Sequence, residues 1–246
     1  MLSLNIHKTK FVAFSLSPRS SPAFQSLIMH DTHCQPGNKT CNCTRTVDRQ
    51  HSIKYLGVIL DENLNWKEHV RCVTNKIRKL IFKFYELRHI LTLGTLKSFY
   101  FAFVESIINY GIAVWGNAGT TIMHKLQIAQ KWVIKVMLFK NKSYLTKLVY
   151  KESELFTPYQ LYIRSIIRFM LKFSYYKENV THGLNTRFAS VNNVLVQIIS
   201  KHNVCQNHIY CVGPKMYNML PLNIRLQPYH KVKGEICKWV SDNIIV

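Results

Sequence analysis

The spacing of apolar positions predicts short strands before about residue 60 and mainly helices after it. From Val70 to Leu91, apolar residues recur in alternating steps of three and four, which is the period of one buried helix face. Asn65 and Glu68, three residues apart just before this stretch, form an N-terminal capping signal, and Gly94 is expected to end the helix. The same period predicts further helices over residues 95–110, 121–140, 158–173, 214–220 and 232–240.

The predicted helices differ in which faces are apolar. Residues 95–110 are apolar nearly all round, which indicates a buried helix that ends at Gly111. Over residues 121–140 the apolar positions share one face, and the opposite face is expected to carry four cations. These outward residues are Lys125, Lys131, Lys135 and Lys140.

Strand signals are confined to the first quarter of the chain. Short apolar runs predict strands near residues 11–14 and 24–29, and residues 53–60 form the clearest one, β-branched around Gly57. The segment between these runs is rich in Ser, Pro, Thr and Asn and reads as loop. We therefore expect a mainly α fold with a small antiparallel β remnant at the N-terminus (α+β).

Charge changes the picture most. The chain has 33 Lys and Arg against 12 Asp and Glu, a formal net charge of +21. Such a surplus favours a polyanionic partner, because neutralised phosphates release condensed counterions. Hydrophobic residues make up 48% of the chain, which argues against global disorder.

Other classes of protein find little support in the sequence. No apolar run approaches the 18–20 residues of a membrane span, and the first residues include Lys8 and Lys10 where a secretory signal would be apolar. Seven irregularly spaced Cys fit a reduced, intracellular protein. Carboxylates are scarce, and the adjacent pair Asp61 and Glu62 is typical of a turn.

Four short motifs carry a resemblance to a known family. LNIHKTKFVAF, IKYLGVILDENLNWKEH, INYGIAVWGNA and GPKMYNMLP occur in this order along the chain. Together they resemble the reverse transcriptases of non-LTR retrotransposons, most closely the jockey-like group. The resemblance begins after the position where that family has its catalytic aspartates.

The resemblance implies an organisation and a function. Residues 1–60 would form the end of the polymerase palm, residues 61–140 a helical thumb, and residues 141–246 a C-terminal connector. The expected function is template–primer binding within an RNA-directed DNA polymerase, located in the nucleus. No catalytic or metal-binding residue is expected here, so the chain alone should be inactive. Mg²⁺ is expected only for the complete polymerase, and the missing palm–fingers half is a possible partner.

The resemblance also assigns binding residues. Lys8, in the KTK segment, would lie near the phosphates of an incoming nucleotide, although taken alone it reads as a solvated turn residue. Lys54, Tyr55 and Gly57 match the primer grip, a hairpin that holds the primer end. The basic helices would contact the duplex backbone through Lys76, Lys79, Lys83, Arg88, Lys131 and Lys135.

Alternative interpretations remain open at this point. A stand-alone basic nucleic-acid-binding module would use the same helices without any polymerase role, and binding to an anionic membrane surface is a third reading. Two His/Cys clusters lack the paired spacing of structural zinc sites, and their side chains are expected to be packing residues. They comprise His30, His33, Cys34, Cys41 and Cys43 in the first, and His202, Cys205, His208 and Cys211 in the second.

Overall fold

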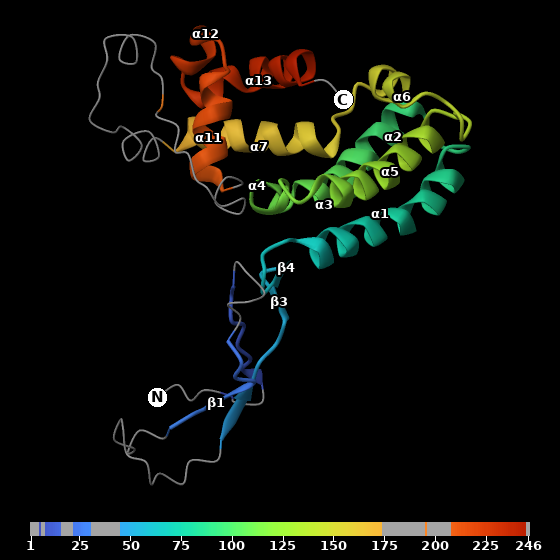
Figure 1. The fold of residues 1–246 in the computed structure, drawn as a ribbon. Helices are drawn as coiled ribbons and strands as arrows, with labels where there is room; N and C mark the ends of the chain where they lie inside the picture. Colours follow the sequence, from blue (N-terminus) through green and yellow to red (C-terminus); the bar gives the residue numbers. More distant parts are fainter. Residues whose placement is uncertain are drawn as a thin grey trace. The chain divides into compact units, whose positions relative to one another are not determined.

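The computed structural model describes Asn5, residues 8–15, 22–30 and 45–173, Leu195 and residues 208–244. The chain divides into two compact units, Met1–His69 and Val70–Val246. Helices dominate, and two small antiparallel sheets lie near the N-terminus (Figure 1). The expected α+β class is therefore confirmed.

The first unit contains two separate two-stranded sheets. Strand β1 (Ser26–Ile28) pairs with β2 (Thr46–Asp48), and β3 (Ser52–Tyr55) pairs with β4 (Val58–Asp61), both antiparallel. The weak strand predicted near residues 24–29 is confirmed. The strand predicted over residues 53–60 is wrong as a single strand, because a two-residue turn folds it into a hairpin. The run at 11–14 makes only one bridge, from Phe11 to Arg49.

Polar contacts rather than an apolar core join the parts of this unit. The buried Arg49 side chain pairs with Glu62, its Nη2 lying 2.9 Å from Oε2, and Nη1 donates to the carbonyl of Pro22. His51 also bonds Glu62 and, together with Arg49, lowers the pKa of that carboxyl. Among the described residues of this unit, Val47 is the only buried apolar side chain.

The long amphipathic helix α1 (Lys67–Leu87) belongs to the second unit except for its first three residues. The predicted stripe is confirmed at Val70, Val73, Ile77 and Phe84, which are at most 4% exposed. The predicted stop at Gly94 is wrong. The helix ends seven residues earlier, and Gly94 lies in the first turn of the next helix, whose N-cap is the Thr92 hydroxyl.

The segment predicted as one buried helix is helical throughout but changes its pitch. It comprises α2 (Leu93–Tyr100), the π-helical turn η3 (Phe101–Glu105) and α3 (Ser106–Asn109), and it ends at Gly111 as expected. One face is buried, while Phe101 and Phe103 are about half exposed. The expectation of burial all round is therefore wrong.

A buried glutamine connects the helices that follow. After α4 (Ile112–Trp115) come α5 (Thr120–Met137) and α6 (Thr146–Ser153). The side chain of Gln130 on α5 is fully buried, and its Nε2 donates to the Tyr100 hydroxyl (2.7 Å) and to the Phe156 carbonyl (2.8 Å). Its Oε1 accepts from the Tyr150 hydroxyl at 2.8 Å. One amide therefore satisfies polar groups from α2, α6 and the segment before α7.

Helix α7 (Pro158–Lys172) is the centre of the second unit. It packs against α3, α4 and α5, and also against α11 (Ile209–Asn218) and α13 (Tyr229–Asn243), so that it lies between the two groups (Figure 1). The short α12 (Leu222–Arg225) contacts α13. A full capping box of Thr157 and Gln160 starts α7. The helices predicted over 158–173 and 232–240 are confirmed, whereas α6 was not predicted.

A buried ion pair joins α7 to the π-helical turn. The Arg164 guanidinium lies 2.6 Å from Oε1 of Glu105, and both side chains are about nine-tenths buried. Asn109 donates a further hydrogen bond to the same oxygen at 3.1 Å. Because a buried charge without a partner is costly, each member of the pair requires the other.

Two of the motifs behind the family resemblance are packing motifs in the structure. In INYGIAVWGNA, the Trp115 indole donates to the Tyr110 carbonyl, and a Cβ added to Gly116 would lie 2.5 Å from the Tyr162 ring. In GPKMYNMLP, the Asn218 amide accepts from the N–H of Leu195 and donates to its carbonyl. Their residue types are thus explained by close helix approach and backbone pairing.

Replacing Gln130 with Leu is expected to destabilise the second unit by about 2–4 kcal/mol, because two tyrosine hydroxyls and a carbonyl would lose their partner. Burial raises the pKa values of Tyr100 and Tyr150, so both hydroxyls stay protonated at neutral pH, Tyr100 as an acceptor from Gln130 and Tyr150 as a donor to it. Urea unfolding followed by tryptophan fluorescence measures the change. Lys125→Ala, at an exposed position of the same helix, should stay within about 0.5 kcal/mol of the parent. Equal stability of parent and Gln130→Leu would contradict the role of this amide.

Candidate nucleic-acid interface

The hairpin of β3 and β4 presents its turn to solvent. Tyr55 pairs with Val58, and the two residues between them, Leu56 and Gly57, have φ values of 44° and 85°. Two consecutive positive φ angles define a type I′ turn, which suits glycine but strains leucine. Tyr55 is 63% exposed and Leu56 74%. Lys54, Tyr55 and Gly57, predicted as one binding element, therefore lie together at an exposed tip.

The turn after the hairpin is organised by one carboxylate. Asp61 accepts hydrogen bonds from the backbone N–H groups of Asn63 (3.2 Å), Asn65 (3.1 Å) and Trp66 (2.8 Å). Both oxygens are engaged, and the side chain is buried. Asp61 thus acts as a turn residue, as expected, and its neighbour Glu62 pairs with Arg49. Because Asp61 is held by backbone N–H groups and Glu62 by a guanidinium, these two carboxylates do not fit a Mg²⁺ site.

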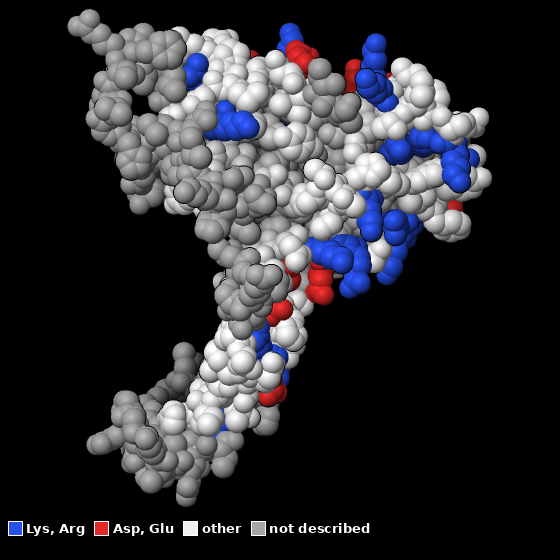
Figure 2. Space-filling view, in the orientation of Figure 1, with Lys and Arg blue, Asp and Glu red and all other residues white. Residues whose placement is uncertain are grey.

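Helix α1 carries a row of three exposed lysines. Lys76, Lys79 and Lys83 are spaced by three and four residues, so they share one flank, clear of the buried stripe. Within the described part of the chain, none of the three ammonium groups forms an ion pair. Figure 2 shows Lys and Arg side chains gathered over α1. This flank presents positive charge that is free to meet phosphate.

Arg88 lies apart from that flank. Five residues after Lys83, it is rotated by about 140° around the helix axis. Its guanidinium carbon lies 4.0 Å from the centroid of the Tyr85 ring and 4.7 Å from that of Phe139. The prediction that Arg88 lies on one flank with the three lysines is wrong, because the five-residue step turns it toward Tyr85 and toward Phe139, which follows α5.

The lysines predicted on the neighbouring helix also point elsewhere. The ammonium of Lys135 is buried and donates to the Lys142 carbonyl at 2.5 Å, and Lys131 donates to the Thr146 hydroxyl at 3.2 Å. The expectation that Lys135 faces outward is wrong, because α6 and the segment before it cover that side of α5. Burial, and then the charge of Lys131, lowers the pKa of Lys135.

Lys8 lies in a small capped turn. Asn5 accepts the Lys8 N–H through both its side chain and its carbonyl, and its carbonyl also accepts the Thr9 hydroxyl. The N-x-x-K-T spacing is thereby explained as a local turn. The Lys8 side chain is exposed, and its contact with a nucleotide phosphate stays a prediction.

No metal centre is assembled by the part of the chain that the structure describes: no three His, Cys, Asp or Glu side chains there converge. Most residues of the two His/Cys clusters fall outside the described residues. His30, His208 and Cys211 lie within them, and His208 caps α11 by accepting the Tyr210 N–H.

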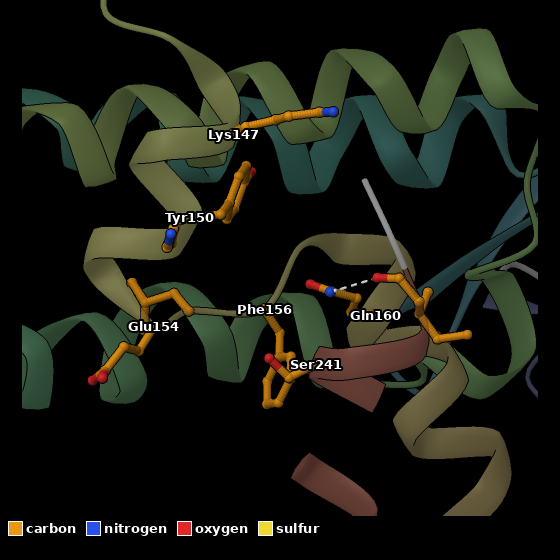
Figure 3. Close-up of a pocket in the computed structure, with 9 residues that line it drawn as sticks. Lys147, Tyr150, Glu154, Phe156, Gln160 and Ser241 are labelled. Atoms are coloured by element: carbon orange, nitrogen blue, oxygen red, sulfur yellow. Dashed lines mark hydrogen bonds between the residues drawn. The ribbon is translucent and has the colours of Figure 1, made fainter. Parts of the chain in front are cut away.

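A cavity of about 380 Å³ opens beside the start of α7 (Figure 3). Its wall includes Lys147, Tyr150, Glu154 and Gln160, and the Gln160 amide donates to the Ile244 carbonyl at 2.8 Å. Tyr150 is held by Gln130, and Glu154 pairs with Lys97. The side chains of Tyr150, Glu154 and Gln160 are thus committed to structural contacts, and the wall shows no nucleophile–base pair.

The sequence interpretation assigned no role to four exposed residues on α1. Arg71, Arg78, Phe82 and Tyr85 lie off the apolar stripe and form a second flank, with Phe82 67% and Tyr85 49% exposed. The signal was present in the periodicity, because two aromatic residues off the stripe of an amphipathic helix are expected to face solvent.

Two curated proteins match part of the chain. An RNA-directed DNA polymerase from mobile element jockey of Drosophila funebris is 32% identical over 88 residues, which is 35% of this chain and 10% of that protein. A probable RNA-directed DNA polymerase from transposon X-element of Drosophila melanogaster is 29% identical over 94 residues, 37% of this chain and 10% of that protein. No protein-family profile and no solved structure matches.

These matches support a relationship to the RNA-directed DNA polymerases of mobile elements, which is the broad relationship that the motifs indicated. Each match spans about a tenth of the relative's length. None of the helices in the described part of the chain is both long and apolar enough to cross a membrane.

Leu56→Asn is expected to stabilise the β3–β4 hairpin, because Asn followed by Gly is the favoured pair for a type I′ turn. Relief of about 1 kcal/mol of backbone strain should slow amide hydrogen exchange across the ladder by roughly five-fold. Gly57→Ala, at φ 85°, should accelerate the same exchange. Unchanged exchange in both variants would contradict the turn geometry.

Lys135→Met is expected to change the dependence of stability on pH. The lowered pKa means that the folded chain releases this proton before the unfolded chain does, so the free energy of unfolding contributed by Lys135 rises with pH up to the ordinary lysine pKa. The parent should therefore gain stability relative to the variant as the pH rises toward the ordinary lysine pKa of about 10.5. Urea titrations at several pH values measure the difference, and a pH-independent difference would argue against a buried ammonium.

Proposed function

We propose that this chain contributes template–primer binding to an RNA-directed DNA polymerase of a mobile element. Lys76, Lys79 and Lys83 on α1 would contact the phosphate backbone of the duplex, and the exposed hairpin tip would hold the primer end. The relationship to polymerases of mobile elements supports the choice of nucleic acid as the partner. A nuclear location accords with this role.

The lysine flank of α1 is the observation that carries the proposal. Three exposed ammonium groups recur at helical spacing along about ten ångströms of helix. Point charges on flexible stems suit contacts to phosphates, which are independent of sequence and sensitive to salt. Lys131 and Lys135 are left out of this surface because their ammonium groups bond to residues 142–146.

The hairpin tip supplies a second kind of contact. A glycine at the turn lets a ligand backbone approach closely, and Tyr55 next to it offers a ring for stacking. Leu56 is held at a positive φ in an exposed position, which is a cost that a functional turn can carry. Lys54 adds positive charge beside the ring.

The first unit supports a role as part of a larger assembly. Phe14, Phe24, Leu27 and Ile28 are 44–57% exposed, while one described apolar side chain of this unit is buried. Two-stranded sheets are marginal alone and gain stability when their apolar faces are covered. A palm–fingers half, carrying the catalytic aspartates and Mg²⁺, would cover such faces. The chain itself is proposed to supply no catalytic group.

The alternative function is a stand-alone basic nucleic-acid-binding module. It would use the same lysines, and its first unit would have no polymerase partner. The polymerase role and the stand-alone module can be distinguished by adding a palm–fingers half prepared from a jockey-like polymerase. Primer extension that depends on this chain supports the polymerase role, and undiminished binding without any extension supports the module.

The triple variant Lys76→Ala, Lys79→Ala, Lys83→Ala should bind a primed RNA–DNA hybrid more weakly, and the slope of log affinity against log salt should fall by about 2–3. Each lost phosphate contact releases one fewer set of counterions. Fluorescence anisotropy over a range of salt concentrations measures the slope, and an unchanged unfolding midpoint shows that the helix is intact.

A matched control separates the site from the net charge. The triple variant Lys231→Ala, Lys233→Ala, Lys238→Ala also removes three positive charges, here from exposed positions of α13. This variant should keep a slope within about one of the parent. If both triple variants lose the same slope, the binding is a property of overall charge and the α1 flank has no special part in it.

A further inference from the structure

The second exposed flank of α1 differs in chemistry from the lysine flank. Arg71, Arg78, Phe82 and Tyr85 follow one another at steps of seven, four and three residues, so they form a single row along the helix. The row is displaced from the three lysines by roughly a third of a turn around the helix axis. It combines two guanidinium groups with two exposed rings, one of them 67% exposed and the other 49%.

The aromatic end of this row is ordered by its neighbours. The Arg88 guanidinium carbon lies 4.0 Å from the Tyr85 ring centroid, and the His89 ring meets Tyr85 edge-on at 5.8 Å. Both groups also contact the ring of Phe139. A ring held in this way loses little freedom when a ligand stacks on it, which reduces the entropic cost of binding.

The row is suited to flat, negatively charged ligands. Glu68 and Glu86 lie between the two flanks, at the two ends of the helix. The position between the two arginines is the uncharged Asn75, so the row itself contains no carboxylate. The exposed rings at Phe101 and Phe103 differ, because the segment from residue 98 to 104 has no charged side chain. An apolar partner alone does not require arginines in line with rings, whereas a nucleic acid uses both.

We propose that the row of Arg71, Arg78, Phe82 and Tyr85 binds unpaired nucleotides, with bases stacked on Phe82 and Tyr85 and phosphates paired with the two arginines. Stacking requires an exposed base face, which a paired duplex provides only at its ends. Helix α1 would then bind the duplex with its lysine flank and the adjoining single strand with this row. The inference deepens the proposed nucleic-acid function and rests on it for its biological setting.

The test compares two ligands on the full chain. One is a blunt RNA–DNA hybrid, and the other is a single-stranded pyrimidine oligonucleotide, used both as DNA and as RNA. The double variant Phe82→Ala, Tyr85→Ala should lose on the order of ten- to hundred-fold affinity for the single strand. Its salt slope should stay unchanged because no charge is removed, and its affinity for the blunt hybrid should stay within about two-fold.

Three further variants sharpen the test. Phe82→Tyr with Tyr85→Phe keeps both rings and should bind the single strand as the parent does. Phe101→Ala with Phe103→Ala removes two exposed rings elsewhere and should leave single-strand binding unchanged. Glu86→Gln, one turn after Phe82, removes a neighbouring negative charge and should strengthen single-strand binding by about two- to five-fold.

The outcomes separate this proposal from the proposed function. Loss of hybrid binding in the lysine variant, with single-strand binding that ignores Phe82 and Tyr85, would overturn the second site alone. Suppose that single-strand binding depends on Phe82 and Tyr85, but that the parent chain binds the primed hybrid of the earlier test no better than other nucleic acids. This result would support the second site and overturn the template–primer function. A parent chain that binds no single strand, or a ring variant that weakens both ligands equally, overturns the second site, and equal weakening points to a partner protein or to general packing.

Discussion

The helical unit depends on the amide of one buried residue, Gln130. Its two ends bond the hydroxyls of Tyr100 and Tyr150 and the carbonyl of Phe156, so three segments that are distant in sequence share a single polar centre. A buried amide stabilises a fold only when its donors and acceptors are satisfied. This requirement fixes how α2 and α6 pack against α5, and it fixes the position of the segment that leads into α7.

A second constraint is the distribution of positive charge. With a formal net charge of +21, the chain would repel itself if every cation were crowded on one surface. Several cations are instead used internally: Arg164 pairs with Glu105, Arg49 with Glu62, and Lys135 bonds a backbone carbonyl. Two of the few carboxylates, Glu62 and Glu105, are thus paired with structural cations. What remains on α1 is a flank of lysines facing solvent.

The motifs that indicate the family divide into two physical kinds. Those of the helical unit are explained by packing, since Trp115 and Gly116 serve close helix contact and Asn218 bonds the backbone of Leu195. The hairpin motif is different, because Tyr55 and Leu56 are exposed and contribute nothing to a core. A strained, exposed turn is thus the motif that packing explains least, and it lies in the unit with the smaller apolar core.

The sequence by itself determined the fold class, the amphipathic helix α1, the stop at Gly111 and the lysine flank, because these follow from local periodicity and backbone preference. It could not place Lys135, Arg88 or Gly94 correctly. A lysine among outward positions reads as solvated until another helix covers it, and a glycine ends a helix only where no earlier break occurs. Only the tertiary structure decided these positions, since the packing partner of each face is set by segments far away along the chain.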